Sequence, residues 1–139
     1  MNNKLLSFGH GYSAHALERL LSLNDWEIFA TTRDSEKSSV INNHKVSAFI
    51  WPGTDLVSQI ENATHILLSI PPNKNGDPVF LEYGNVIASS KNLKWVGYLS
   101  TTGVYGDHSG GWVDENTPLK PTTERGNKRV LAERQWLEL

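Results

Sequence analysis

Short apolar runs alternate along the chain with segments in which apolar residues recur at helical spacing. The run 5–8 predicts a first strand. The residues after it predict an amphipathic helix, with apolar positions on one face and polar residues between them: Ala14, Leu17, Leu20 and Leu21 against Glu18, Arg19 and Ser22. The same reading predicts further strands at 26–32, 46–51, 64–70 and 93–100, and further helices within 34–43, 56–60, 78–89 and 124–139.

The run 64–70 is nearly continuous in its apolar content and ends at Pro71 and Pro72, which cannot continue a hydrogen-bonded ladder. Such a run is typical of a parallel strand that is covered on both faces. The alternation of strands and helices predicts parallel pairing through right-handed crossovers. The sequence therefore predicts an α/β fold: a Rossmann-type doubly wound parallel sheet of about five strands in the order 3-2-1-4-5, in one domain over residues 1–139.

The first predicted strand runs into the sequence GHGYSA, from Gly9 to Ala14, which has the pattern G-x-G-x-x-A. Gly9 allows the tight turn, Gly11 lets the backbone approach a pyrophosphate, and the small Ala14 lets the helix pack closely on its strand. The helix N-terminus then faces the phosphates. We interpret the turn, with Tyr12 in it, as a dinucleotide-binding site. The alternative is an ordinary loop, because a glycine motif alone is a weak signal.

Ligands of such sheets bind outside the carboxyl ends of the strands, which here are closed by Gly9, Arg33, Pro71 and Ser100. Arg33 follows the second strand, where an acidic residue would bind a ribose 2′-hydroxyl and a basic residue accepts a 2′-phosphate. NADP is therefore the favoured cofactor. Two alternatives stay open: Arg33 forms a surface pair with Asp34 or Glu36, or Asp34 turns inward and NAD binds instead.

The amino-acid composition indicates which classes of binding partner to expect. Thirteen basic residues against fifteen acidic ones give a net charge of −2 without a basic cluster, so we expect a small-molecule substrate and neither nucleic acid nor a membrane. A homodimer stays open. The chain has no cysteine, which excludes disulfides and thiolate chemistry. We expect a cytoplasmic protein, because the N-terminus lacks a signal-peptide core. The histidines, among them His44, form no metal-ligand pattern with nearby carboxylates, and we predict no metal.

Two later runs carry a family resemblance. The run from Tyr98 to Gly106, YLSTTGVYG, and the run from Val113 to Pro121, VDENTPLKP, resemble the extended short-chain dehydrogenase/reductases, the NAD-dependent epimerase/dehydratase group. The resemblance extends in the family's order from the glycine turn to Glu133. It implies that Thr101 hydrogen-bonds the substrate oxygen, although a threonine that closes a strand also serves as a β-former or a helix cap.

The chain departs from this family at the Tyr-x-x-x-Lys pair, in which the phenol exchanges a proton with the substrate and the lysine binds ribose. Lys128 has the expected place, but the residue four positions earlier is Glu124. A carboxylate cannot hand over a proton at neutral pH as a phenol can, so the usual reductase mechanism is in doubt. Tyr105 is the nearest alternative phenol. The candidate catalytic residues are thus Thr101, Lys128 and Tyr105.

The chain ends at Leu139, in or just after the helix that carries Lys128. Members of this family continue into a C-terminal substrate lobe, which we expect to be absent here, so that the chain is either a fragment or a truncated gene product. We therefore hypothesise an NAD(P)-binding oxidoreductase or nucleotide-sugar epimerase/dehydratase with a non-standard active site. The alternatives are a non-catalytic NADP-binding or redox-sensing module, and a structural remnant without a ligand.

Overall fold

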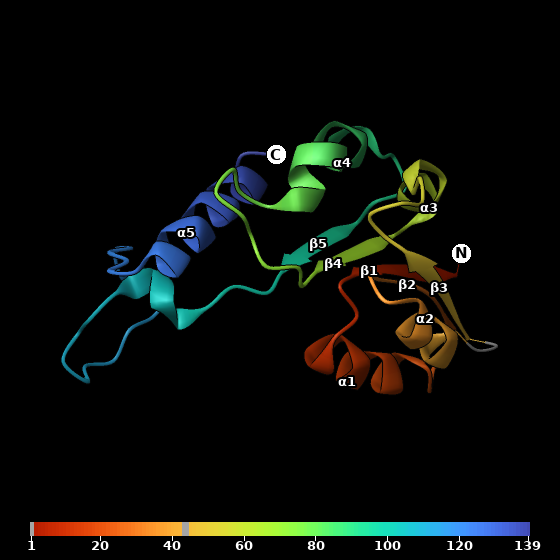
Figure 1. Ribbon diagram of the computed structural model, residues 1–139, viewed down its shortest axis with the longest axis horizontal. Helices are drawn as coiled ribbons and strands as arrows, with labels where there is room; N and C mark the ends of the chain where they lie inside the picture. Colours follow the sequence, from red (N-terminus) through yellow and green to blue (C-terminus); the bar gives the residue numbers. More distant parts are fainter. Residues whose placement is uncertain (1, 43–44) are drawn as a thin grey trace.

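The computed structural model describes residues 2–42 and 45–139 (Figure 1). Its centre is a five-stranded sheet in the spatial order β3-β2-β1-β4-β5, and every neighbouring pair is parallel. The predicted strand order is confirmed. The strands are β1 (Asn3–Phe8), β2 (Trp26–Thr32), β3 (Val46–Ile50), β4 (His65–Leu68) and β5 (Trp95–Tyr98).

Helices cover both faces of the sheet. Figure 1 shows the helices on either side of the sheet, with the last helix at the β5 side of the molecule. On the first face lie α1 (Tyr12–Leu21) and α2 (Ser35–Ile41); on the second lie α3 (Val57–Asn62), α4 (Pro78–Ser89) and α5 (Glu124–Leu137). A layered arrangement of this kind buries both faces of a parallel sheet and explains its apolar strands.

The two faces of β1 supply two apolar cores. Leu6 and Phe8 point to the side of α3 and α4, where they pack with buried residues such as Ile66. Leu5 points to the other side and packs with Ala14 of α1 and Ile28 of β2. Side chains that alternate between two buried faces are the expected result of a central parallel strand.

Several predicted details differ from the structure. Strands β4 and β5 are shorter than the predicted 64–70 and 93–100, and a 3₁₀ turn, η1 (Thr102–Tyr105), lies in a segment for which we predicted neither a helix nor a strand. Leu20 is 65% exposed, whereas Glu18 is buried. The buried face of α1 therefore contains fewer apolar residues than its sequence pattern predicts. Glu18 can be buried because two histidines contact its carboxylate. Among the described residues, no helix is both long enough and apolar enough to cross a membrane.

Candidate functional site

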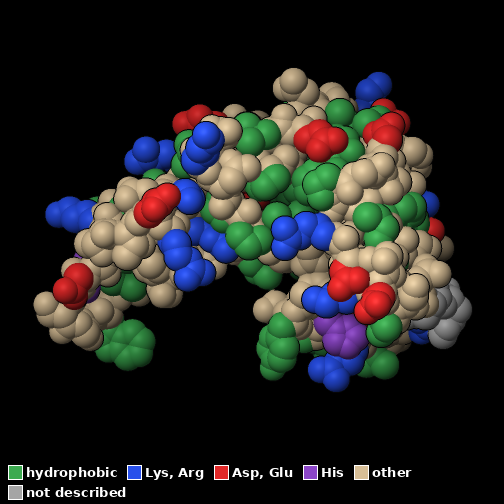
Figure 2. Space-filling view, viewed as in Figure 1, with side chains coloured by type: hydrophobic (Ala, Val, Ile, Leu, Met, Phe, Trp, Pro, Cys, Tyr) green, Lys and Arg blue, Asp and Glu red, His purple; other side chains and the backbone are tan. Residues whose placement is uncertain are grey.

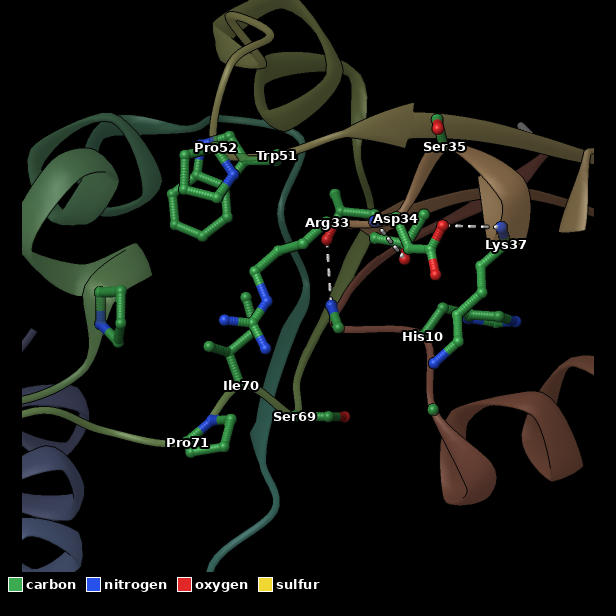
Figure 3. Close-up of a pocket in the computed structure, with 15 residues that line it drawn as sticks. His10, Arg33, Asp34, Ser35, Lys37, Trp51, Pro52, Ser69, Ile70 and Pro71 are labelled. Carbon is green, nitrogen blue, oxygen red and sulfur yellow. Dashed lines mark hydrogen bonds between the residues drawn. The ribbon is translucent and has the colours of Figure 1, made fainter. Parts of the chain in front are cut away.

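A cleft of about 1000 Å³ opens at the carboxyl ends of β1, β2, β3 and β4. Gly9 and Gly11 form one wall, Arg33 and Lys37 a second, and the turn Ser69-Ile70-Pro71 a third. Figure 3 shows Arg33, Lys37 and the turn Ser69-Ile70-Pro71 around this cleft. Parallel strands bring their carboxyl ends to one edge of the sheet, and the cleft lies where the crossover connections leave β1 in opposite directions.

The glycine turn is held to the end of β2 by its own backbone. Gly9 N donates to Thr31 Oγ1 at 3.0 Å, and His10 N donates to the Thr31 carbonyl oxygen at 3.0 Å. Gly9 has a φ of +78°, and a Cβ on it would lie 2.8 Å from Ile70 Cγ1. The nearest atom to a Cβ on Gly11 would be 3.9 Å away. Gly9 is therefore required by the protein's own packing, whereas the space beside Gly11 is left open.

Helix α1 begins at this turn without a side-chain cap. Its N-cap is Gly11, which has no side chain to accept from the first-turn N–H groups. Three other helices are capped, α2 by Asp34, α4 by Asp77 and α5 by Thr123. Uncapped N–H groups at a helix N-terminus, together with the helix dipole, favour the binding of an anion. The open end of α1 meets the cleft at Gly11.

Two cations face the same cleft. In Figure 3, Arg33 extends toward Ile70, and Lys37 reaches from α2 toward the glycine turn near His10. Neither forms an ion pair with any residue in the described part of the chain. Asp34 lies in the same lining, where its Oδ1 accepts from Glu36 N at 2.9 Å and from Lys37 N at 3.4 Å as the cap of α2. The space-filling view shows Lys and Arg side chains near the middle of this face, beside the hollow between its α5 and α1 sides (Figure 2).

A polar atom without a partner also belongs to the cleft. The Oγ of Ser69 is buried and has no hydrogen-bond partner among the described residues. Buried hydroxyl groups are ordinarily satisfied by protein, by ordered water or by a ligand, so the Ser69 hydroxyl has an unused hydrogen-bonding capacity in the cleft wall. The cleft therefore combines an open helix N-terminus, two cations and a free hydroxyl, which is a donor set suited to a phosphorylated ligand.

The structure gathers only some of the predicted cofactor residues. Gly9, Gly11, Arg33 and Pro71 line the cleft. Ala14 is buried against β1 and β2, as a residue at the contact between helix and strand should be. The remaining three lie outside the lining: Tyr12, which is 95% exposed, Ser100 and Lys128.

The predicted catalytic residues lie around η1 and the start of α5. Thr101 is the N-cap of η1, and its Oγ1 accepts from Gly103 N at 3.3 Å. Tyr105 closes η1. Lys128 Nζ lies 3.0 Å from Glu124 Oε1, one turn earlier on α5. Thr101 thus has the capping role that the sequence left open as an alternative, and its hydroxyl stays exposed at the end of β5.

A tight backbone approach joins η1 to α5. Gly126 lies in the first turns of α5 and is buried, and a Cβ on it would be 2.9 Å from the Gly103 carbonyl oxygen. Farther along α5, Arg129 donates to the Leu99 carbonyl oxygen at 2.8 Å and to Tyr98 Oη at 3.2 Å. Burial raises the pKa of Tyr98, although Arg129 acts in the opposite direction. These contacts hold Lys128 at a defined position beside η1.

The loop between β4 and α4 is tied to the far end of α5. Asp77 N donates to Gln135 Oε1 at 2.9 Å, and Gln135 Nε2 donates to the Asn75 carbonyl oxygen at 3.0 Å. Asp77 is fully buried, and its Oδ1 accepts from Val79 N and Phe80 N. Burial raises the pKa of Asp77; the two N–H groups, Trp136 and Arg129 lower it by smaller amounts. The loop forms the cleft wall near Pro71 and Pro78.

Sequence reasoning missed three features of this region. It did not select Lys37 or Ser69, and it found no link between His10, His15 and Glu18. Those three side chains lie together at the start of α1. A signal existed for the helical part, because His15 and Glu18 are three residues apart and share a helix face. His44 lies outside the described residues.

No family model matches the sequence, and no curated protein sequence matches it. Solved structures do. A functionally unknown conserved protein from Silicibacter pomeroyi matches with a TM-score of 0.88 and 46% identity, over 97% of this chain and 48% of that one. The chain has a Rossmann-type fold.

Two proteins that were solved with a nicotinamide cofactor have the same fold at lower sequence identity to this chain. The dTDP-glucose 4,6-dehydratase of Bacillus anthracis, solved with NAD, gives a TM-score of 0.71 at 15% identity, over 95% of this chain and 48% of that one. Gre2 of Candida albicans, solved with NADPH, gives 0.67 at 16% identity, over 98% of this chain and 52% of that one. The chain spans about half the length of each of these three proteins.

Proposed function

We propose that residues 1–139 form an NAD(P)-binding domain that prefers NADP(H), as part of an enzyme of the short-chain dehydrogenase/reductase type. The observation that carries this proposal is the uncapped N-terminus of α1, which opens at Gly11 into a cleft with two unpaired cations, Arg33 and Lys37, within the described part of the chain. The solved structures of similar fold that hold NAD or NADPH support a nicotinamide cofactor.

Each wall of the cleft has a role in this proposal. The N–H groups at the start of α1 bind the pyrophosphate, and Gly11 lets it approach. Arg33 and Lys37 bind a 2′-phosphate, which carries the charge that distinguishes NADP from NAD. Ser69 Oγ and Pro71 contact the cofactor between its two ends. Tyr12, Ser100 and Lys128 remain proposed contacts from outside the cleft, with Lys128 and Ser100 toward the nicotinamide end.

The charge of Arg33 gives the first test. We expect Arg33→Ala to weaken NADP binding about ten- to a hundredfold, because a charge-assisted contact to a phosphate contributes about 1.5 to 3 kcal/mol. We expect NAD binding to change little. Isothermal titration calorimetry with both cofactors measures this, and Lys37→Ala should act in the same direction. Arg125→Ala, which removes an exposed cation of α5, is the matched control. Equal losses for NADP and NAD would exclude the 2′-phosphate role.

For the reaction we propose reduction of a carbonyl, or epimerisation or dehydration of a nucleotide-sugar-like substrate. A bound nicotinamide supplies hydride transfer. Thr101 hydrogen-bonds the substrate oxygen. Tyr105 is the phenol closest in sequence to Glu124, which holds the place of the family's tyrosine, and Tyr105 donates the proton instead. Lys128 binds the ribose. The close contact between Gly126 and the Gly103 carbonyl keeps η1 and α5 at a fixed separation, which positions these groups relative to one another.

A second candidate function is a non-catalytic NADP-binding or redox-sensing module. The observation that favours it is the ion pair of 3.0 Å between Lys128 Nζ and Glu124 Oε1. A lysine that is held by a carboxylate at the place of the family's phenol has no proton donor to assist.

Turnover separates the two candidates. We expect residues 1–139 alone to bind NADPH without consuming it at an enzyme-like rate, because Glu124 cannot donate a proton as the family's phenol does. A whole enzyme that contains these residues should consume NADPH with a panel of aldehydes, ketones and nucleotide sugars, and Thr101→Ala and Tyr105→Phe should lower that rate about 10² to 10⁴-fold. Absorbance of NADPH measures the rate, and calorimetry on the same samples establishes that the cofactor is bound. Thr102→Ala is the control, since it removes a neighbouring exposed hydroxyl. Bound NADPH without consumption for any substrate in that whole enzyme would favour the non-catalytic module.

A further inference from the structure

Two histidines and a glutamate converge at the start of α1. His10 Nε2 lies 2.7 Å from Glu18 Oε2, and His15 Nδ1 lies 3.1 Å from the same oxygen. One ligand atom from each residue falls within 4.8 Å of the others. His10 comes from the glycine turn, whereas His15 and Glu18 share one face of α1. The fold thus brings together donors from two segments.

The burial of the cluster is graded from inside to outside. The side chain of His10 is 1% exposed and that of Glu18 is 12% exposed, whereas the side chain of His15 is 59% exposed. Histidine is visible on the surface over α1 in Figure 2. The inner donor is therefore enclosed by protein while the outer donor meets solvent, so an ion can reach the cluster from the side of His15.

The inner histidine is held by a second partner. His10 Nδ1 lies 3.1 Å from Oγ of Ser7, a residue that is fully buried in β1. Histidines that bind metals usually have their other ring nitrogen fixed by a hydrogen bond, which sets the tautomer and the ring orientation. Without a metal, the 2.7 Å contact needs Nε2–H to donate to Glu18 Oε2. A metal that displaces this proton would be bound by the Nε2 lone pair, while Nδ1–H donates to the Ser7 hydroxyl.

We propose that His10, His15 and Glu18 bind a divalent transition-metal ion, with Zn²⁺ as the favoured ion. Imidazole nitrogens and one carboxylate are a donor set of zinc sites, and the carboxylate supplies negative charge. Zinc bonds of about 2.0 to 2.1 Å place tetrahedral donors about 3.3 Å apart, so the histidine–glutamate pairs at 2.7 and 3.1 Å need small shifts. The two histidine nitrogens lie within 4.8 Å of each other, and a movement of the exposed His15 side chain would bring them to the same spacing. Three protein ligands leave a fourth position for water. The site adjoins the proposed cofactor position, because His10 also lines the cleft, but none of its three ligands is among the proposed cofactor contacts.

Calorimetric titration of the untagged chain with Zn²⁺ tests the proposal. We expect one Zn²⁺ per chain, and we expect His15→Ala and Glu18→Gln each to weaken binding by more than about tenfold. Glu18→Gln keeps the shape of the side chain and removes only its charge. His108→Ala is the matched control, because His108 is an exposed histidine outside the cluster. The His108→Ala variant should bind Zn²⁺ with the same affinity as the wild type.

Co²⁺ provides a readout that does not depend on the variants. Its visible absorption is intense in a four-coordinate site and weak in the aqueous ion, so the wild-type chain should develop an intense spectrum that saturates at one equivalent. Circular dichroism of each variant establishes that it is folded; if His15→Ala is unfolded, Glu18→Gln and the Co²⁺ spectrum decide. The proposal would be overturned if the spectrum of Co²⁺ with the wild-type chain stayed that of the aqueous ion, or if the wild type and the cluster variants bound Zn²⁺ with equal affinity.

Discussion

Replacement of Gly9 by alanine is expected to lower the free energy of unfolding by about 2 to 4 kcal/mol. The φ of +78° is unfavourable for any residue with a Cβ, and the added atom would meet Ile70 Cγ1 at 2.8 Å and Ile70 N at 3.3 Å. The side-chain atom can move, but the backbone nitrogen belongs to the segment that follows β4. Chemical denaturation followed by circular dichroism measures the change.

Gly11 is the matched control for this substitution, because it occupies the same turn and has open space beside it. Its φ of −93° is accessible to any residue. Gly11→Val should therefore fold with a stability within about 1 kcal/mol of the wild type and should lose NADP binding, since its side chain fills the proposed position of the pyrophosphate. If Gly11→Val binds NADP with unchanged affinity, the turn is an ordinary loop. Equal stability of Gly9→Ala and the wild type would contradict the strain at Gly9.

Replacement of Asp77 by alanine should destabilise the protein by about 2 kcal/mol relative to Asp77→Asn. Asp77 caps α4 by accepting from Val79 N at 2.8 Å and from Phe80 N at 3.1 Å, and the whole residue is buried. Asparagine keeps a side-chain oxygen for these two donors, whereas alanine leaves them unpaired. Urea denaturation of the two variants gives the difference, and equal stabilities would show that the cap contributes nothing.

The Asp77→Asn variant also tests the pKa of Asp77. Burial raises this pKa above the ordinary value of 3.8, so the native state binds more protons than the unfolded state between the two values. The unfolding free energy of the wild type should therefore fall as the pH rises through this window, by the contribution of this one group. Asparagine does not titrate, and the variant should gain stability relative to the wild type across the same window. A constant difference would contradict the raised pKa.

The strand order could be predicted from the sequence because it depends on strong, local signals. A glycine turn after the first strand, apolar runs that end at prolines, and alternating helical segments leave few topologies open. The position of Arg33 at the end of β2 followed from the same signals, since each strand end is marked in the sequence. The exact bounds of β4 and β5 did not follow, because apolar residues such as Ile70 continue past the last strand residue.

The missed residues depend on contacts between segments. Lys37 faces the cleft because Asp34 caps α2 and so fixes where that helix begins, and the sequence alone does not show which side chains of a short polar helix point inward. The sequence pattern likewise predicts that Glu18 lies on the polar, exposed face of α1. Its burial depends on His10, which reaches it from the preceding turn. A one-dimensional pattern does not contain such a pairing.

The side chain of Gln135 forms hydrogen bonds with both Asp77 N and the Asn75 carbonyl oxygen, which couples the motion of α5 to that of the β4–α4 loop. One side chain at the end of α5 completes the hydrogen bonding of the β4–α4 loop, which forms a wall of the cleft. If α5 frays at its C-terminal end, that loop loses two hydrogen bonds in the same event, and Gly76, whose Cβ position is filled by Gln135, loses its close neighbour. The end of α5 and the cleft wall should therefore open and close as one cooperative unit, so that thermal fluctuations at the end of the last helix are transmitted to the cleft.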